Sequence, residues 1–353
     1  MPAPSTSFRC PTSPADRTAL DQKLTAALKP HVAALGAKAR ALRSVLIDVC
    51  GVRVHEQYQA TTAEEAQSVA SVTKTFVGTL VGIALADGSL SSMDQTLAEL
   101  LPQHRSVMSS QVATITLRQL LTMTAGLDAD LNGSPSGVSA SSDHLVDDIL
   151  KEGVVNHPGR FAYSSASSHL LSAILQQATG RSTLDYARAK LFGPLGIDTT
   201  DAAEPVMVDA NLPAYQKARF AWPVDQQGVN YGGGLLKIRP QDMARLGQVY
   251  LDNGRWNGQQ VVPESWVRAA TKGQVPASEG FGGEQYGYQW WVTTAGGHPA
   301  YAAVGIGGQL LEVVPDRSLV VVFTTQDDPS GPGPVSPSAY QVIVSASIVP
   351  ALA

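Results

Sequence analysis

The spacing of apolar residues predicts strands near both ends of the chain and helices between them. Residues 44–49 and 52–56 are two short strand-like runs around Gly51, a pattern typical of a β-hairpin. Towards the C-terminus, the same criteria predict three strands, over residues 287–293, 308–314 and 318–325. We expect the hairpin and these later strands to join in one antiparallel sheet.

Apolar residues at helical spacing occupy most of the chain between these strands. The clearest helices are predicted over residues 117–122 and 169–178, with others over residues 15–41, 241–252 and 338–348. One more helix is marked by a periodic apolar face and by Asp87-Gly88 as its end; the face consists of Val77, Leu80, Val81, Ala84 and Leu85.

These elements predict an α+β fold, an antiparallel sheet flanked by helices with an inserted all-α lobe. A chain of 353 residues is longer than single hydrophobic cores usually become, so one large domain or two closely joined ones are expected. We assign residues 17–90 plus 217–353 to the sheet domain and residues 91–216 to the helical domain, with the active site in the cleft between them. Residues 1–16, rich in Pro, Ser and Thr, are expected to be a flexible lead-in.

Composition limits the partners and the compartment. The net charge of −5 and the lack of clustered Lys and Arg argue against nucleic acid. The longest apolar run, residues 77–86, is interrupted by Gly78 and Gly82, so we expect no membrane span. No basic segment followed by an apolar one opens the chain. The protein is therefore cytoplasmic if the chain is complete, and secreted or periplasmic if a leader has been removed. Both a monomer and a homodimer stay open.

Cysteine and histidine usage suggests neither a disulfide framework nor a metal centre. Cys10 and Cys50 can pair, but two cysteines in a chain this long favour unlinked thiols, with Cys50 buried in a strand. No C-x-x-C or H-E-x-x-H motif occurs and the seven histidines are scattered, so we expect no metal and no cofactor. His157 and His169, which flank Tyr163, are interpreted as structural.

The sequence Ser71-Val72-Thr73-Lys74 is the strongest candidate for chemistry. Side chains three apart in a helix share a face, so the Ser71 hydroxyl would lie about one turn before the Lys74 amine. A neutral lysine can take the proton that makes serine a nucleophile. We expect Ser71 in the first helical turn, where free backbone N–H groups can stabilise an oxyanion. About one S-x-x-K match arises by chance in such a composition, so the motif needs support elsewhere.

Two other segments give that support. Tyr163-Ser164-Ser165 precedes a predicted helix, and the Tyr163 phenol can relay a proton between serine, lysine and leaving group. Residues 303–309, Ala-Val-Gly-Ile-Gly-Gly-Gln, place glycines at a strand edge, where another backbone can approach closely. An oxyanion site built on a strand N–H requires such an approach. By itself, the glycine segment is also typical of a bulge or a tight turn.

With these motifs, the chain resembles the serine β-lactamase-like hydrolase superfamily from about residue 44 to residue 344. The best-matching branch contains class C β-lactamases, D-alanyl-D-alanine carboxypeptidases, family VIII esterases and 6-aminohexanoate-dimer hydrolases. Further matching segments follow in order at residues 120–126, 158–162, 192–196, 231–234 and 287–291. The resemblance implies a β-lactamase/transpeptidase-like fold. It also implies that Ser71 forms an acyl-enzyme while Lys74 and Tyr163 share the acid and base work.

The resemblance further implies an oxyanion hole made of the backbone N–H groups of Ser71 and Ile306, with Gly305 beside it. This follows if the family's third motif aligns with residues 303–305. Alignment with the next three residues would make Gln309 the donor instead. Neither alignment supplies the cation that penicillin-recognising members carry there, so a substrate carboxylate loses its usual partner.

The sequence thus favours a serine hydrolase of small esters or amides, similar to an esterase or a 6-aminohexanoate-dimer hydrolase. One alternative is a class C-type β-lactamase or D-alanyl-D-alanine carboxypeptidase, and another is a catalytically silent binding homologue. Residues 133–137 resemble the nucleophile elbow of an α/β-hydrolase, but Pro135 stands at the serine position.

Candidate substrate contacts come from an acidic loop and from aromatic residues. Asp128 and Asp130 are candidates to hold a substrate ammonium group, although their pattern favours a solvated acidic loop. Ser165 is a further candidate for substrate binding. Tyr231, Trp290 and the neighbouring Trp291 are candidates for an apolar pocket wall, although aromatic residues here are at least as typical of a core.

Overall fold

The computed structural model describes residues 9–127, 142–153, 157–207, 212–277, 283–326 and 335–353. Eight strands of this part form one antiparallel sheet in the order β2-β1-β12-β11-β10-β9-β8-β7. Their bounds are β1 Leu42–Val49, β2 Val52–Tyr58, β7 Val275–Pro276, β8 Gln285–Tyr286, β9 Trp291–Ala295, β10 His298–Gly305, β11 Gln309–Val314 and β12 Leu319–Thr325. The predicted N-terminal hairpin is therefore confirmed. It joins the C-terminal strands through β12, with Leu46 opposite Val322.

The sheet also contains a strand that the sequence did not indicate. β10 carries three alanines and Pro299, residue types with weak strand propensity, so its apolar pattern is faint. It pairs with β9 on one side and with β11 on the other. The strand predicted from residue 287 begins only at Trp291, because Gln289 has a left-handed φ of 62° that interrupts it.

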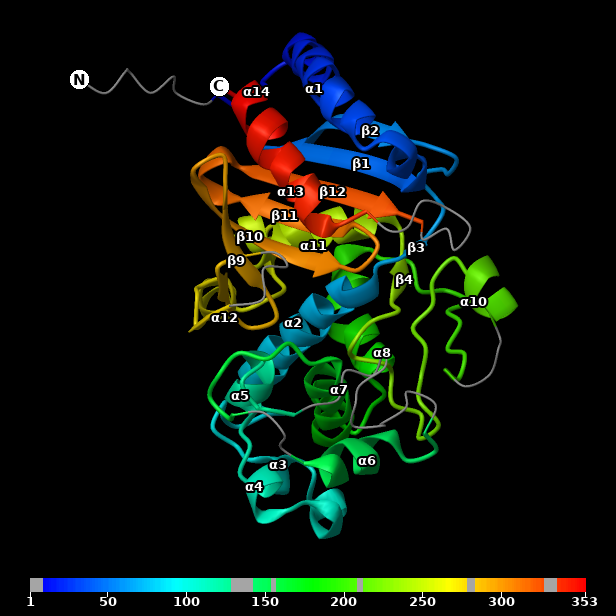
Figure 1. Ribbon diagram of the computed structural model, residues 1–353, viewed down its shortest axis with the longest axis vertical. Coiled ribbons are helices and arrows are strands. Elements are labelled where there is room, and N and C mark those ends of the chain that lie inside the picture. The colour runs from blue at the N-terminus through cyan, green and yellow to red at the C-terminus, as the bar shows by residue number, and fades with distance from the viewer. Residues whose placement is uncertain (1–8, 128–141, 154–156, 208–211, 278–282, 327–334) are drawn as a thin grey trace, which may run out of the picture.

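Helices cover both faces of the sheet (Figure 1). On one face lie α1 Pro14–Ala34 and α13 Pro337–Ile343, and the latter continues through a π-helical turn into α14 Val349–Ala351. On the other face lies α11 Pro240–Leu251, which packs against β1, β11 and β12. The helix predicted over residues 15–41 ends at Ala34, because Gly36 takes a left-handed φ of 58° and a 3-10 turn follows.

Most of the remaining helices form a helical block beside the sheet (Figure 1). They are α2 Thr73–Ala86, α3 Leu97–Leu100, α4 Ser110–Ala113, α5 Leu117–Leu121, α6 Leu145–Glu152, α7 Ser165–Thr179, α8 Thr183–Ala187, α9 Gly193–Leu195, α10 Leu212–Lys217 and α12 Glu264–Ala270. Short strand pairs are β3 Gln67–Ser68 with β4 Lys237–Ile238, and β5 Arg255–Trp256 with β6 Gln259–Gln260.

Helix α2 connects the sheet and the helical block. It packs against α7, and one apolar core runs from Leu171 of α7 to Val313 of β11. The division at residues 91 and 216 stays a prediction.

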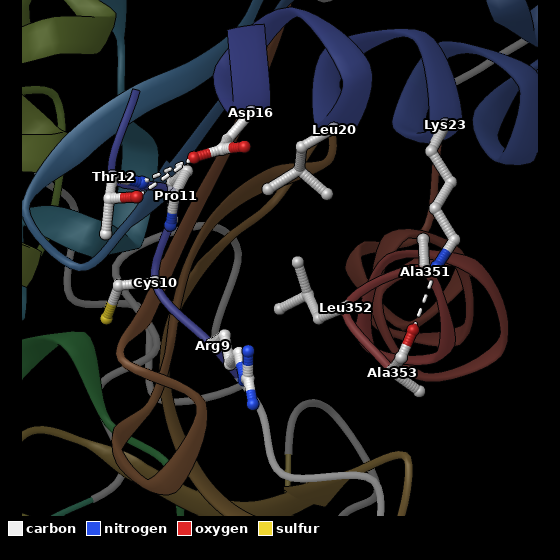
Figure 2. Close-up of a pocket in the computed structure, with 10 residues that line it drawn as sticks. All are labelled: Arg9, Cys10, Pro11, Thr12, Asp16, Leu20, Lys23, Ala351, Leu352 and Ala353. Atoms are coloured by element: carbon white, nitrogen blue, oxygen red, sulfur yellow. Dashed lines mark hydrogen bonds between the residues drawn. The ribbon is translucent and has the colours of Figure 1, made fainter. Parts of the chain in front are cut away.

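The N-terminal helix and the C-terminal residues lie side by side at one end of the sheet. Lys23 Nζ of α1 donates a hydrogen bond of 2.9 Å to the carbonyl oxygen of Ala353 (Figure 2). A pocket of about 680 Å³ opens between these elements and residues 9–12. None of the candidate catalytic residues lines it, so this pocket is separate from the predicted site.

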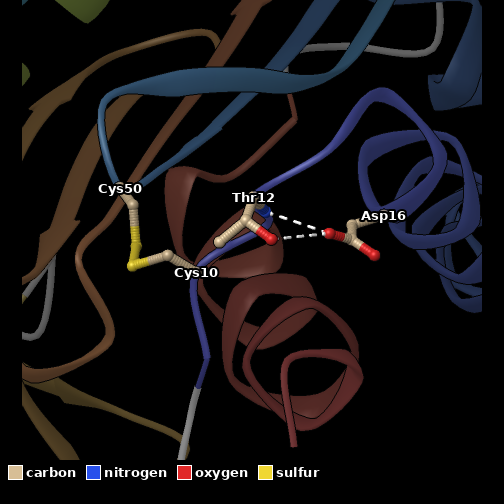
Figure 3. Close-up of a disulfide and its surroundings, with 4 residues drawn as sticks. All are labelled: Cys10, Thr12, Asp16 and Cys50. Carbon is tan, nitrogen blue, oxygen red and sulfur yellow. Dashed lines mark hydrogen bonds between the residues drawn. A yellow bond between two sulfur atoms is a disulfide. The ribbon is translucent and has the colours of Figure 1, made fainter.

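A disulfide fastens the N-terminal segment to the sheet (Figure 3). Cys10 is bonded to Cys50, and Cys50 lies in the turn between β1 and β2 with a left-handed φ of 53°. The expectation of two unlinked thiols, with Cys50 inside a strand, is therefore wrong. The turn brings Cys50 to the end of the hairpin, where the incoming segment passes, and sequence spacing contains no signal of that passage. Ser13 then caps α1 by accepting a hydrogen bond from the backbone of Asp16.

None of the helices within the described ranges combines the length and the apolar character needed to cross a bilayer.

Candidate active site

Ser71 lies in a tight turn between β3 and α2. The turn, Ala70–Val72, is a 3-10 helix and α2 begins only at Thr73, so Ser71 lies two residues before the α-helix instead of in its first turn. Ala70 has a left-handed φ of 45°. A non-glycine residue adopts this conformation at an energetic cost, which indicates that the surroundings hold the turn in place.

Contacts on one side of the turn explain how it is held. Val69 N donates to Leu236 O at 2.8 Å, and Leu236 N donates to Thr73 Oγ1 at 3.0 Å. Thr73 Oγ1 in turn donates to Ala70 O at 2.6 Å. The segment that leads into β4 therefore fixes the backbone on both sides of Ser71.

Lys74 lies beneath Ser71 with its side chain almost completely buried, 1% exposed. Its Nζ atom is 2.9 Å from Ser71 Oγ, within hydrogen-bond distance. Nζ also donates to the carbonyl oxygen of Gly233 and lies 4.9 Å from the centre of the Tyr163 ring. The structure thus brings the three predicted catalytic side chains together around one buried amine.

Tyr163 is held by aromatic neighbours. Its ring stacks on Trp291 with the ring centres 5.7 Å apart, and it meets Tyr286 edge-on at 6.4 Å. Burial raises the pKa of Tyr286 well above its usual value, so this phenol stays neutral. Just after Tyr163, Ser164 begins α7 as its N-cap and accepts a hydrogen bond from Ser167 N at 3.1 Å.

The end of β10 lies against the opposite side of the Ser71 turn. A Cβ atom on Gly305 would lie 2.5 Å from Val69 O and 3.1 Å from Ala70 Cβ, so only glycine permits this approach. Gly305 pairs with Gln309 as the last residue of the strand, and Ile306 begins the connecting turn with its side chain 73% exposed.

Hydrogen bonds from Gln309 and Thr325 fix that turn. The Gln309 side chain donates to Thr325 O at 2.9 Å and accepts from Thr325 N at 3.1 Å, and Thr325 Oγ1 donates to Gly307 O. Gly308 faces Tyr340 and Thr325 instead of the Ser71 turn. Of the three glycines in residues 303–309, Gly305 is therefore the one beside the Ser71 turn, which is the geometry expected if the third motif is residues 303–305.

The candidate substrate-binding residues lie in different environments. Trp290 has no exposed surface and packs on Tyr250, with ring centres 4.6 Å apart, so its prediction as a pocket wall is wrong. Ser165 and Tyr231, exposed by 3% and 4%, lie against the backbone of Gly233. Through these contacts they support the backbone whose carbonyl oxygen accepts a hydrogen bond from Lys74. Asp128 and Asp130 lie outside the described residues.

One feature of the site escaped the sequence-based prediction. The partner of Lys74 is a backbone carbonyl, that of Gly233, and a carbonyl leaves no side-chain signature in a sequence. Of the two tryptophans predicted for the pocket wall, Trp291 is the one that contacts Tyr163. Alternation along a strand could have separated the two tryptophans if the strand start had been placed correctly. In the part of the chain that the structure describes, no group of three His, Cys, Asp or Glu side chains is arranged to hold a metal ion.

An antiparallel sheet with a helical block, and a serine–lysine pair at the start of the helix that connects them, define the β-lactamase/transpeptidase-like fold. A family model described as Beta-lactamase matches residues 26–344. The chain belongs to this beta-lactamase family.

Individual relatives are distant. The 6-aminohexanoate-dimer hydrolase of Paenarthrobacter ureafaciens is 25% identical over 301 residues, which cover 78% of this chain and 70% of the relative. Penicillin-binding protein 4 of Amycolatopsis lactamdurans is 25% identical over 280 residues, 75% of this chain and 73% of the relative. Among solved structures, EstCE1, described as a hydrolase with promiscuous acyltransferase activity, superposes with a TM-score of 0.71 at 17% identity, covering 92% of this chain and 98% of its own. That likeness concerns the fold alone.

Proposed function

We propose that the protein is a serine hydrolase that forms an acyl-enzyme on Ser71 and hydrolyses small carboxylic esters or amides. The observation that carries the proposal is the 2.9 Å separation of Lys74 Nζ and Ser71 Oγ, with the lysine buried. An amine at this distance can accept the serine proton as the hydroxyl oxygen attacks a carbonyl carbon.

In the proposed reaction, the carbonyl oxygen of the substrate gains negative charge as Ser71 attacks. The backbone N–H groups of Ser71 and Ile306 would stabilise that charge, since the end of β10 lies directly against the Ser71 turn. Lys74 and Tyr163 would return a proton to the leaving alkoxide or amine, leaving the acyl group on Ser71. Water, deprotonated by the same pair, would then release the carboxylic acid and restore the serine.

The surroundings of Ser71 favour an apolar substrate over one with a carboxylate. Ile306 and Leu235, exposed by 73% and 40%, each follow a glycine that lies beside Ala70. Ala303, which stands where penicillin-recognising members carry a cation, is buried at 1% exposure. An anionic substrate would therefore lack a charged partner at this position.

A comparison of three substrates tests the proposal. We expect turnover of p-nitrophenyl esters and of a linear amide dimer, and much slower turnover of the β-lactam nitrocefin. All hydrolysis should disappear in Ser71→Ala, with Ser68→Ala, an exchange in the neighbouring strand β3, as the matched control. Nitrocefin turnover equal to ester turnover would favour the β-lactamase alternative. An inactive but folded wild-type protein would favour the silent binding homologue.

A further inference from the structure

A histidine–carboxylate pair without any exposed surface lies behind the backbone segment that contacts Lys74. His169 is on α7, and its Nε2 atom is 3.0 Å from Asp225 Oδ2. Both side chains are 0% exposed. Burial of two ionisable groups is costly unless their hydrogen bonds are satisfied, and an apolar pair of similar volume would fill the space at least as stably. Packing alone therefore does not explain this pair.

Neighbouring donors fix the protonation pattern of the histidine. The backbone N–H of Gly232 donates to His169 Nδ1 at 3.4 Å. Since a backbone N–H can only donate, Nδ1 must carry the lone pair and the ring proton must be on Nε2. Nε2 then donates to Asp225.

Asp225 is in turn oriented by the loop that carries it. Its Oδ1 atom accepts hydrogen bonds of 2.9 Å from Gln227 N and from Val229 N. All three partners of the carboxylate are donors, so Asp225 acts as an acceptor towards His169 and selects the Nε2–H tautomer.

The segment next to His169 leads directly to the catalytic lysine. Gly233, which follows Gly232, accepts a hydrogen bond from Lys74 Nζ through its carbonyl oxygen. A Cβ atom on Gly232 would lie 2.2 Å from Ser168 O, so this backbone is pressed against α7 beside the histidine. The position of the Gly233 carbonyl therefore depends on how Gly232 is held.

The orientation of the Gly233 carbonyl matters for the chemistry of a neutral lysine. A neutral amine has two N–H donors and one lone pair. When one N–H points to Gly233 O, rotation about the last side-chain bond is restricted, and the lone pair can be directed at Ser71 Oγ, 2.9 Å away. Loss of that anchor would leave Lys74 near the serine but poorly oriented to accept its proton.

We propose that His169 and Asp225 are positioning residues of the reaction: through Gly232 and Gly233 they orient Lys74 towards Ser71. This inference rests on the proposed function. It assigns the pair no contact with the substrate, and it replaces the interpretation of His169 as merely structural.

Asp225→Asn tests the proposal with almost no change in shape. The asparagine keeps Oδ1 for Gln227 and Val229, but its amide would donate to His169 Nε2. The ring proton then moves to Nδ1, which can no longer accept from Gly232. We expect the rate of Ser71 labelling by a fluorophosphonate to fall about 10- to 100-fold, since a small misplacement of a catalytic group has effects of this size. The KM for a p-nitrophenyl ester should not change, and 15N NMR should show the proton on Nδ1.

A second pair of variants separates orientation from packing if Asp225→Asn does not fold. His169→Asn places an acceptor oxygen near the Nδ1 position and keeps the bond to Gly232, whereas His169→Gln reaches Asp225 and loses that bond. The proposal predicts that His169→Asn is labelled about 10-fold faster than His169→Gln. Equal labelling of these two variants, or an unchanged rate in Asp225→Asn, would overturn it. If the wild-type protein itself is not labelled at Ser71, the proposed function fails instead.

Discussion

Lys74 and Glu312 are both ionisable, both 1% exposed, and yet surrounded very differently. Lys74 contacts Ser71 Oγ, the Gly233 carbonyl and the Tyr163 ring. Glu312, on β11, belongs to the face of the sheet that α1 and α13 cover, and neither of its carboxyl oxygens has a hydrogen-bond partner among the described residues. Burial accordingly raises the pKa of Glu312 to about 8.

The difference shows how a buried ionisable group can be interpreted. A buried ionisable group that contacts reactive and polar neighbours, as Lys74 does, is a candidate for chemistry. A group left without partners simply stays neutral and reduces stability. We therefore expect substitutions around Lys74 to change the reaction rate more than stability, and changes in the layer around Glu312 to do the reverse.

The largest effect is expected from Lys74→Met, which keeps the length of the side chain but removes the base. Ester hydrolysis should fall at least about 10⁴-fold, as for other catalytic groups that act as a unit. The melting temperature should stay close to that of the wild type, because an apolar chain replaces a buried amine. Lys151→Met, on the exposed surface of α6, is the matched control and should keep full activity. Substantial hydrolysis by the Lys74 variant would contradict the role of the lysine.

Glu312→Gln is expected to change stability in a pH-dependent way. Between pH 4.5 and about 8, the unfolded carboxyl is ionised while the folded one keeps its proton. The free energy of unfolding of the wild type should therefore fall as pH rises, by about 1.4 kcal/mol per pH unit and about 5 kcal/mol in all. The glutamine variant lacks this loss. Urea unfolding at pH 5, 7 and 9 measures it, and parallel curves for the two proteins would show that Glu312 is not buried as described.

Removal of the Cys10–Cys50 bridge tests the same region as Glu312, the layer between the sheet and helices α1 and α13. The bond closes a loop with a sequence separation of 40 residues, and bridges of this kind contribute about 2–4 kcal/mol. Thermal unfolding of the oxidised protein and of the double Cys→Ser variant should differ by that amount. The kcat of the folded variant should equal that of the wild type. A loss of kcat without a loss of stability would contradict the separation between the two regions.

The smallest effect is expected from Gly305→Ala. The new methyl group would lie 2.5 Å from Val69 O and would push β10 away from the Ser71 turn. We expect kcat to fall about 10- to 100-fold through displacement of the oxyanion site. Gly305 has no positive φ, so its variant tests the contact, whereas Gly297→Ala, just before β10, has a positive φ of 85° and no atom within 4 Å and so reports on backbone strain alone. If the two variants lose the same activity, the contact with Val69 is not what matters.

The sequence predicted the parts of the fold and site that depend on local pattern. The β1–β2 hairpin and the helix after Ser71 follow from apolar spacing and from their end signals. The serine–lysine spacing is likewise local, and its side chains meet as expected even though Ser71 lies in a 3-10 turn.

Features that depend on long-range packing could not be predicted. β10 is a strand because β9 and β11 pair with it, although its alanines and Pro299 give little strand signal. The disulfide joins residues that only the folded chain brings together. The His169–Asp225 pair spans 56 positions, and its connection to Lys74 passes through backbone atoms, which no residue pattern reveals.

The central claim is that Ser71, activated by Lys74, becomes acylated. Rapid acid quenching during turnover of a slowly released p-nitrophenyl ester, followed by intact-mass and peptide mapping, measures this most directly. The account predicts one acyl group per molecule on the peptide that contains Ser71, strongly slowed formation in Lys74→Met, and no adduct in Ser71→Ala. Turnover without any acyl adduct, or an adduct on another residue, would contradict it.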